Sequence, residues 1–511
     1  MNTKIGNQHG KAFATTSGRT RRRSAEAVRR AVRTLQFAGL FFAAWLFPSI
    51  ASDASENYAV VVSAPTASDA GWAQVVQALK AKHSAQLILF TNDVTEVLPA
   101  LRAGFPRYAC FVARPTEVTR EFVAAVHRLT RRLNDDPYTD CFWGILTGYD
   151  ATNALAIARQ EQPLTIRKVA SATTLPMDMI EAGVCFSELQ KNWMLKKDKG
   201  GEPKELKGPD DTTQSIVDAL NTYAPDLFVT SGHATEHDWM IGYRYRNGFF
   251  KHADGKLFGL DTRQQQFPVA SPNPKIYLPI GNCLMGHIDR ADCMATSWMN
   301  SAGVCQMLGY TVETWYGYMG WGVMDYFIDQ PGRYTFNEAF FANEQALTFR
   351  LATYFPAALN AEAKIDVNSA TPVKLTDQAL AAGLTANDAR GLLYDRDTVA
   401  FYGDPAWAAR MADRPKYFEQ TLTVKGDTYT FSIKPNRGAD SFKAVDPNGS
   451  QRGGRPFIAF LPHRVRDAKI ISGAEWKPVI TENFILMPNP GVCDVKRDYR
   501  VVFTAANRDS K

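Results

Sequence analysis

Two short apolar runs decide the fold of this chain: LFVTSGH at residues 227–233 and KIYLPIGNC at residues 275–283. Pro, Gly or Asn bounds each run, which is typical of a buried strand in a parallel sheet. The first run ends in His233 and the second in Cys283. Because the carboxyl ends of strands in an open α/β sheet face a common crevice, two neighbouring strands of this kind bring an imidazole and a thiol together.

Strand and helix signals alternate along the first part of the chain. Four strand candidates, each followed by a helical segment, lie at residues 58–64, 86–90, 107–113 and 141–147. Three more follow at residues 183–186, 303–308 and 399–402. This alternation predicts an α/β fold of doubly wound, mostly parallel sheets with helices on both faces.

Three segments between these candidates carry weaker signals. Residues 196–211 are charged and rich in Gly and Pro, which predicts an exposed loop. Residues 240–273 are rich in Gly, Arg and Gln and are expected to form a lid or rim over the crevice. Glycines at 317, 320 and 322 among aromatic residues favour a loop beside the cleft over a packed helix.

From Lys416 onward the runs are short, β-branched or aromatic, and separated by Gly, Pro and Asn. Such a pattern indicates a small β-sandwich. A chain of 511 residues is long for a single core. We therefore expect an export signal, an N-terminal α/β subdomain, a second α/β subdomain and a β-sandwich, over residues 1–51, 57–165, 166–412 and 413–511.

The N-terminal segment indicates export. An Arg-rich leader precedes the run LQFAGLFFAAWLFPSI at residues 35–50, which is about sixteen residues long, whereas a membrane span needs roughly 20. Ser49 and Ala51 follow in the spacing of a cleavage site, and the alternative is an uncleaved anchor. The prediction is a secreted, periplasmic or cell-surface protein with no stable membrane span after signal cleavage.

Charge and cysteine content narrow the function classes. Much of the net charge of +6 lies in the leader, and no basic-aromatic stripe follows, so we expect no nucleic acid partner. The seven cysteines are an odd number without the dense spacing of a disulfide framework. At least one thiol is therefore expected to be unpaired.

Cys283 and His233 are the candidate catalytic residues. A free thiol has a pKa of roughly 8.5, so a nucleophilic cysteine needs a base or a positive field nearby, and an imidazole supplies it. The imidazole then protonates the leaving amine. The backbone N–H groups of Cys283 and Ala234 are the candidate oxyanion donors. The alternative for Cys283 is a buried small apolar residue or half of a disulfide.

The order of these motifs resembles the gingipain-type cysteine peptidases, which are related to the caspases. The resemblance rests on Gly232-His233 after an apolar strand, on Cys283 with Gly286 three residues on, and on the closing Gly403-Asp404-Pro405 followed by a β-domain. It implies a caspase-like α/β/α sandwich with a catalytic subdomain, followed by an immunoglobulin-like domain. The family has Gly where this chain has Ala234, and a positive φ there would strain an alanine.

The resemblance implies an exported cysteine endopeptidase that acts on protein or peptide substrates. No cofactor is required for that chemistry, no catalytic metal is expected, and a structural calcium ion is common in the family. Glu236 is a candidate orienting acid for the imidazole, with an exposed turn carboxylate as the alternative. Trp239 and Trp315 are candidate cleft residues, with core packing as the alternative.

Two other functions stay open. A catalytically idle binding or adhesion protein on the same fold is the first, because Ala234 departs from the family pattern. The second is a zinc peptidase, because His233, Glu236 and His237 fit H-x-x-E-H. That motif needs both histidines on one face of a helix, whereas Ser231-Gly232 directly follows a predicted strand.

Overall fold

The structure of the protein, a computed structural model, describes residues 58–362, 373–445 and 453–508. The predicted export signal lies outside the described residues. Among the described residues, no helix combines the length and the apolar character of a membrane span.

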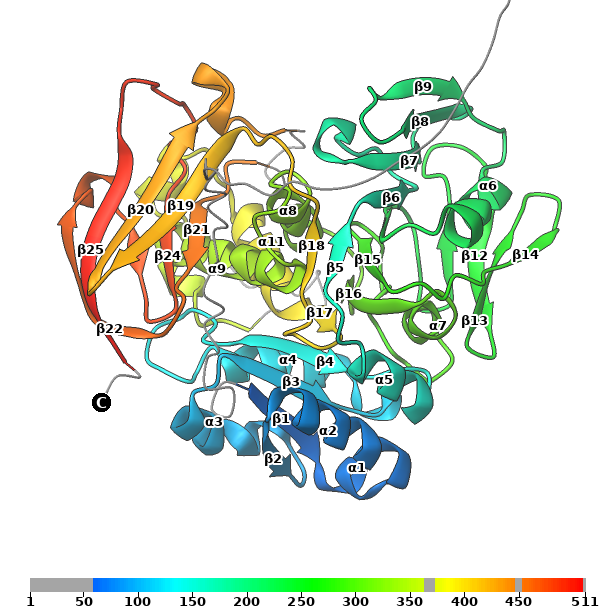
Figure 1. The fold of residues 1–511 in the computed structure, drawn as a ribbon, viewed down its shortest axis with the longest axis horizontal. Coiled ribbons are helices and arrows are strands. Elements are labelled where there is room, and N and C mark those ends of the chain that lie inside the picture. The colour runs from blue at the N-terminus through cyan, green and yellow to red at the C-terminus, as the bar shows by residue number, and fades with distance from the viewer. Residues whose placement is uncertain (1–57, 363–372, 446–452, 509–511) are drawn as a thin grey trace, which may run out of the picture. The chain divides into compact units, whose positions relative to one another are not determined.

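The central feature is a 12-stranded sheet with the order β2-β1-β3-β4-β17-β16-β15-β10-β6-β7-β8-β9 (Figure 1). Neighbouring strands are parallel except at β16–β17, β7–β8 and β8–β9. Both predicted α/β subdomains contribute to this one sheet, which is joined through the parallel pair β4–β17. The prediction of a mostly parallel α/β fold is confirmed at this level, with one continuous sheet in place of separate ones.

The first half of the sheet comes from the N-terminal part of the chain. Its strands are β1 (Tyr58–Ser63), β2 (Gln86–Phe90), β3 (Tyr108–Val112) and β4 (Phe142–Leu146). The helices that connect them are α1 (Ala64–Ser68), α2 (Ala70–His83), α3 (Leu98–Gly104), α4 (Arg120–Thr130) and α5 (Ala151–Ala158). All six residues of β1 are buried, as expected for a strand covered on both faces.

The second half of the sheet contains the strands that end at the candidate catalytic residues. It consists of β6 (Lys168–Ser171), β7 (Ala182–Phe186), β8 (Trp193–Lys197), β9 (Lys204–Lys207), β10 (Leu227–Thr230), β15 (Lys275–Pro279), β16 (Val304–Tyr310) and β17 (Val399–Tyr402). The accompanying helices are α6 (Thr213–Asp218), α7 (Met294–Ser301), α8 (Tyr318–Phe327), α9 (Phe336–Tyr354), α10 (Asp377–Ala381) and α11 (Ala386–Thr398).

Two predicted loops were wrong, and the segment expected to form a lid or rim has regular structure. Residues 196–211 contain β9 and the end of β8, and their pairing carries no apolar signal because every residue of β9 is exposed. Residues 240–273 form most of a small antiparallel sheet of β11 (Asp238–Met240), β12 (Phe249–Ala253), β13 (Lys256–Leu260) and β14 (Gln266–Pro268). The glycines at 320 and 322 lie inside α8, and Gly320 allows close packing there, because a Cβ would come within 2.0 Å of the Ile280 carbonyl oxygen.

The C-terminal part forms two antiparallel sheets that share an apolar core of their own, an arrangement compatible with the predicted β-sandwich. One sheet has the order β19-β20-β25-β22 and the other β21-β24-β23. The strands are β19 (Phe418–Lys425), β20 (Thr428–Pro435), β21 (Phe457–Phe460), β22 (Val465–Ser472), β23 (Val479–Ile480), β24 (Phe484–Met487) and β25 (Tyr499–Asn507).

A buried carboxylate ties the last strand of the large sheet to the first. Asp404, directly after β17, is 1% exposed and accepts hydrogen bonds from Tyr58 (2.8 Å), Lys82 (2.9 Å) and His83 (2.7 Å). Burial opposes its ionisation, but the hydrogen bonds and charges of His83 and Lys82 hold the pKa of Asp404 well below its usual range. The Gly-Asp-Pro motif therefore has a structural role here.

We predict that Asp404→Asn lowers the free energy of unfolding by about 3 kcal/mol at pH 7, because Lys82 loses its buried partner. A carboxyl whose pKa is depressed on folding stabilises the protein above the unfolded value of about 3.9, and this stabilisation is lost as the pH falls. The deficit should therefore shrink below about pH 4.

Urea denaturation of the wild-type protein and the variant at pH 7 and pH 3.5 measures both effects. The control is Asp427→Asn, at an exposed turn position, which should leave stability unchanged. A deficit independent of pH would contradict this role of the Asp404 charge.

Candidate active site

The two strands that carry the candidate residues are neighbours in the sheet. β10 and β15 pair in parallel register from Leu227↔Ile276 to Thr230↔Pro279. The pairing continues past the strand ends, since the N–H of Ile280 donates to the Thr230 carbonyl oxygen at 2.9 Å. The predicted adjacency of the two strands is confirmed, so both chain segments leave the same edge of the sheet.

Asn282 joins the two segments immediately before the reactive residues. Its side chain is fully buried, and Oδ1 accepts from the Thr230 hydroxyl at 2.7 Å. Nδ2 donates to the Gly232 carbonyl oxygen at 3.2 Å. The residue before Cys283 is therefore hydrogen-bonded to the residue before His233, which places the two backbones side by side.

Cys283 is a partly exposed free thiol. The other six cysteines are also free, and burial raises the pKa of each thiol, to about 11 for Cys305. A disulfide at Cys283 is thus absent from the structure. The Cys283 Sγ accepts from the backbone N–H of Thr314 at 3.3 Å, so the loop after β16 supplies one donor to the sulfur.

The turn after Cys283 is strained. Leu284 has a φ of 55°, a left-handed conformation that is costly for a bulky side chain. The surrounding backbone holds it there: the N–H of Leu284 donates to Val312, and that of Gly286 to Tyr310. Only glycine fits at position 286, because a Cβ there would come within 2.2 Å of the Gly309 carbonyl oxygen.

The imidazole of His233 is exposed and lies against the ring of Tyr243, with centroids 4.9 Å apart and an interplanar angle of 31°. Gly232 before it has a φ of 104°, which a glycine adopts without strain. No hydrogen bond links His233 to Cys283 among the described residues. Tyr243 is thus the one aromatic ring that contacts this imidazole in the described part of the chain.

Ala234 does not carry the positive φ that the family's glycine suggests; the left-handed positions are Gly232 and Leu284. Ala234 pairs with Trp239 in a short antiparallel bridge, and the bonds of that bridge flank it: Met240 to His233 and Thr235 to Asp238. Within the described residues, the N–H groups of Ala234 and Cys283 have no hydrogen-bond partner.

Glu236 lies against a different imidazole from the expected one. Its Oε1 accepts from His287 Nδ1 at 2.7 Å, and Arg120 lies 3.9 Å from the same oxygen. His287 follows Cys283 by four residues, so this pair again connects the two loops.

The two candidate cleft tryptophans differ in exposure. Trp239 is fully buried and donates through Nε1 to the Ser231 carbonyl oxygen at 3.0 Å, so its indole is a core side chain. Trp315 is 60% exposed and directly follows Thr314, the residue that contacts the Cys283 sulfur. Trp315 is therefore an exposed aromatic residue beside the loop that contacts Cys283.

The H-x-x-E-H motif does not lie on a helix. Residues 231–240 form bends, a β-bridge at Ala234 and the strand β11, so His233 and His237 do not share a helical face. His233 contacts Tyr243, whereas His237 contacts His252 and Asp289. The geometry that a zinc peptidase of this type needs is absent from this segment.

Asn282, Thr314, Tyr243 and Leu284 belong to the site, but no sequence pattern singled them out. Asn282 had one usable signal, a polar residue at the end of an otherwise apolar run. The other three become visible only when loops distant in sequence come together.

A separate carboxylate cluster bears on the structural calcium ion that the resemblance implies. Asp136, Asp140 and Glu482 each offer an oxygen within 4.8 Å of the others. Asp140 is 1% exposed and its Oδ1 has no hydrogen-bond partner. Burial, together with the charges of Glu482 and Asp136, raises the pKa of Asp140 to about 8. Oxygen ligands of this kind suit Ca²⁺, so the residues fit such an ion, which would join the segment before β4 to the β-sandwich.

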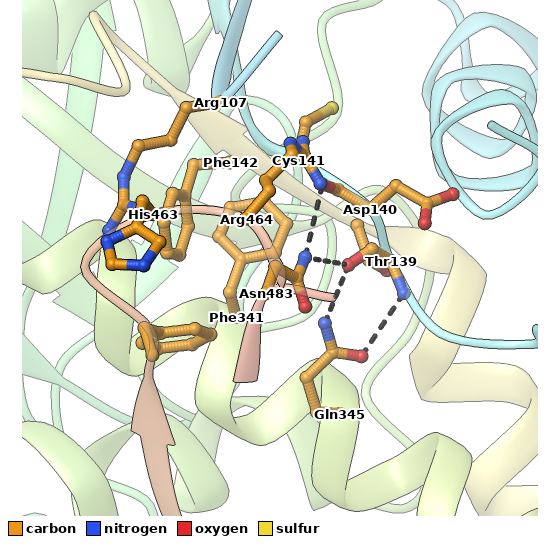
Figure 2. A pocket seen from close by; sticks show the side chains of 11 residues that line it. Arg107, Thr139, Asp140, Cys141, Phe142, Phe341, Gln345, His463, Arg464 and Asn483 are labelled. Carbon is orange, nitrogen blue, oxygen red and sulfur yellow. Dashed lines mark hydrogen bonds between the residues drawn. The ribbon is translucent and has the colours of Figure 1, made fainter. Parts of the chain in front are cut away.

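Figure 2 shows how the backbone beside Asp140 is held. Gln345 from α9 accepts from the N–H of Thr139 at 3.1 Å and donates to its carbonyl oxygen at 2.8 Å. Asn483 of the β-sandwich donates to the same carbonyl oxygen at 3.4 Å. The backbone that directly precedes Asp140 is therefore held from two sides.

We predict that Ca²⁺ raises the melting temperature. At a Ca²⁺ concentration of a hundred times the dissociation constant, the free energy of unfolding should increase by about 2.7 kcal/mol. Asp140→Asn should abolish the response to calcium, and Asp427→Asn should retain it. Differential scanning calorimetry with chelator and with added Ca²⁺ measures the shift. Identical melting temperatures in chelator and in calcium would contradict the assignment.

Comparisons with known proteins add little. No protein-family model matches the chain, and no curated protein matches it significantly. A solved structure, "Complex of Porphyromonas gingivalis RgpB pro- and mature domains", is similar with a TM-score of 0.40 and 11% identity, over 88% of this chain and 99% of that chain. A TM-score and an identity this low assign no function to the chain.

Proposed function

We propose that the protein is an exported cysteine endopeptidase in which Cys283 is the nucleophile and His233 the general acid and base. The observation that supports this most directly is the hydrogen bond from Asn282 to Gly232, which ties together the residues that precede the two reactive side chains. A partly exposed thiol, an exposed imidazole and two unbonded N–H groups then lie at one edge of the sheet.

In the proposed mechanism His233 accepts the proton of the Cys283 thiol, and the thiolate attacks the peptide carbonyl carbon. The N–H groups of Cys283 and Ala234 donate to the oxyanion of the tetrahedral intermediate. The protonated imidazole then gives its proton to the leaving amine, and an acyl-enzyme remains. Water, deprotonated by His233, hydrolyses the thioester and frees Cys283.

Orientation of the imidazole falls to Tyr243 in this proposal. The carboxylate of Glu236 is engaged by His287, whereas the ring of Tyr243 lies against His233. The backbone of Tyr243 is itself held, because its N–H donates to the Glu188 carbonyl oxygen at 2.7 Å. The dyad would then work without a third acidic residue, with Glu236 supporting the loop.

The proposed enzyme would belong to the caspase-related, gingipain-like peptidases. A large parallel sheet with reactive residues at the carboxyl ends of neighbouring strands fits a caspase-related, gingipain-like enzyme. Its subdomains would span residues 57–165 and 166–412, with an immunoglobulin-like domain over 413–511. The substrate would be a protein or peptide outside the cytoplasm, and the chemistry itself would need no cofactor.

One observation favours a second candidate, a binding protein with an idle dyad. The Cys283 sulfur accepts from Thr314, and among the described residues no hydrogen bond connects it to His233. Catalytic hydrogen bonds often tighten only when substrate binds, so the missing hydrogen bond is compatible with both candidate functions. An activity measurement distinguishes them.

We predict that the purified protein hydrolyses members of a peptide library and that Cys283→Ala lowers the rate at least about 10³-fold, because no other group replaces the nucleophile. His233→Ala should be similarly impaired. The control is Cys305→Ala, which removes the other partly exposed thiol and should keep the wild-type rate. Equal rates from the wild-type protein and Cys283→Ala would rule out the enzyme.

A further inference from the structure

Two histidines outside the dyad face each other across the loops of the site. His237, in the segment after His233, places Nδ1 3.1 Å from Nε2 of His252 on β12. The other ring nitrogens each contact a carboxylate: His237 Nε2 lies 3.1 Å from Asp289, and His252 Nδ1 lies 3.0 Å from Asp292. The four side chains are thus connected by polar contacts in the order Asp289–His237–His252–Asp292.

The carboxylates determine which nitrogens carry protons. A carboxylate only accepts hydrogen bonds, so His237 must hold its proton on Nε2 and His252 on Nδ1. With both rings neutral, the two remaining nitrogens present lone pairs to each other at 3.1 Å. Two arrangements relieve such a contact: a proton on one ring, which makes an N–H···N hydrogen bond, or a cation that both lone pairs bind.

The spacing suits a metal ion. Two imidazole nitrogens at 2.0–2.1 Å from a tetrahedral Zn²⁺ are about 3.3 Å apart. In metal sites the second ring nitrogen of a histidine ligand usually donates to a carboxylate, which fixes the tautomer. Asp289 and Asp292 hold those positions here. The Asp292 carboxylate is itself held, because it accepts from the N–H of Gly255 at 2.9 Å.

We propose that His237 and His252 bind a zinc-class divalent cation, with Asp289 and Asp292 as its supporting carboxylates. Imidazole ligands favour Zn²⁺ and its late transition-metal neighbours over Ca²⁺ or Mg²⁺. The His237 side chain is 36% exposed, so the ion can enter from solvent. Water would complete its coordination.

The guanidinium of Arg290 lies close to one of the two proposed ligand atoms. Nη2 of Arg290 lies 3.2 Å from His237 Nδ1, and the Arg290 side chain is 60% exposed. The guanidinium takes the position that the lone pair favours for a cation. Because it is exposed, it can move aside, so Arg290 competes with the ion.

The ion would connect three segments of the site. His237 follows His233 by four residues, Asp289 and Asp292 belong to the loop after Cys283, and His252 lies in the small antiparallel sheet. A bound ion would therefore fix the loop of His233 relative to the loop of Cys283. This cation site is distinct from the dyad and from the Asp136–Asp140–Glu482 cluster.

The test is calorimetric titration of Zn²⁺ into the purified protein with Ca²⁺ present. His252→Ala should weaken binding at least about 10-fold, and Asp292→Asn by about 10-fold or more. Arg290→Ala should tighten binding, because it removes the competing cation. Cys283→Ala should bind as the wild-type protein does.

Absorption of bound Co²⁺ gives a second readout: d–d bands without a sulfur charge-transfer band are expected. Thermal denaturation of each variant in chelator establishes that it is folded, and His252→Gln replaces His252→Ala if needed. The proposal is overturned if His252→Ala binds like the wild-type protein, if Cys283→Ala loses binding, or if no saturable binding occurs up to about 1 mM. None of these readouts depends on peptidase activity.

Discussion

The hydrogen bond from the buried amide of Asn282 to the Gly232 carbonyl oxygen is the contact on which the site depends. The pairing of β10 with β15 ends with the bond from the Ile280 N–H to the Thr230 carbonyl oxygen, so the sheet itself does not hold the residues that follow. The amide also accepts from the Thr230 hydroxyl, so both of its polar ends are satisfied inside the protein. A buried amide with satisfied partners stabilises one arrangement of the two segments over others.

Two close backbone approaches, at Gly320 and between Gly286 and Gly309, also hold these segments in place. α8 approaches the Ile280 carbonyl oxygen at Gly320, and the Cys283 turn approaches β16 where Gly286 faces Gly309. A side chain at any of these glycines would push the loops apart. The strained φ of Leu284 persists because the same contacts leave the chain no relaxed alternative.

The strands that could be predicted from the sequence are those with a clear local pattern of apolar residues. The ends of β10 and β15 were predicted because apolar runs flanked by Pro, Gly and Asn mark buried strands. β6 was missed because KVAS at residues 168–171 is short and begins with a lysine, although it pairs with β10 in the sheet. Gly320 and Gly322 suggested a loop, whereas the structure uses them for tight packing of a helix. Among the candidate site residues, the partner of Glu236 could not be predicted, because His287 reaches it only through tertiary contact.

The central claim is that the imidazole of His233 activates the thiol of Cys283, and the alkylation rate of Cys283 by iodoacetamide at pH 6.5, followed by mass spectrometry, tests it most directly. The account predicts rapid, selective modification of Cys283 and at least about ten-fold slower modification in His233→Ala, because a thiol without a base is mostly protonated at this pH. His463→Ala, which removes an imidazole of the β-sandwich, should leave the rate unchanged. Equal alkylation rates in the wild-type protein and His233→Ala would contradict the account.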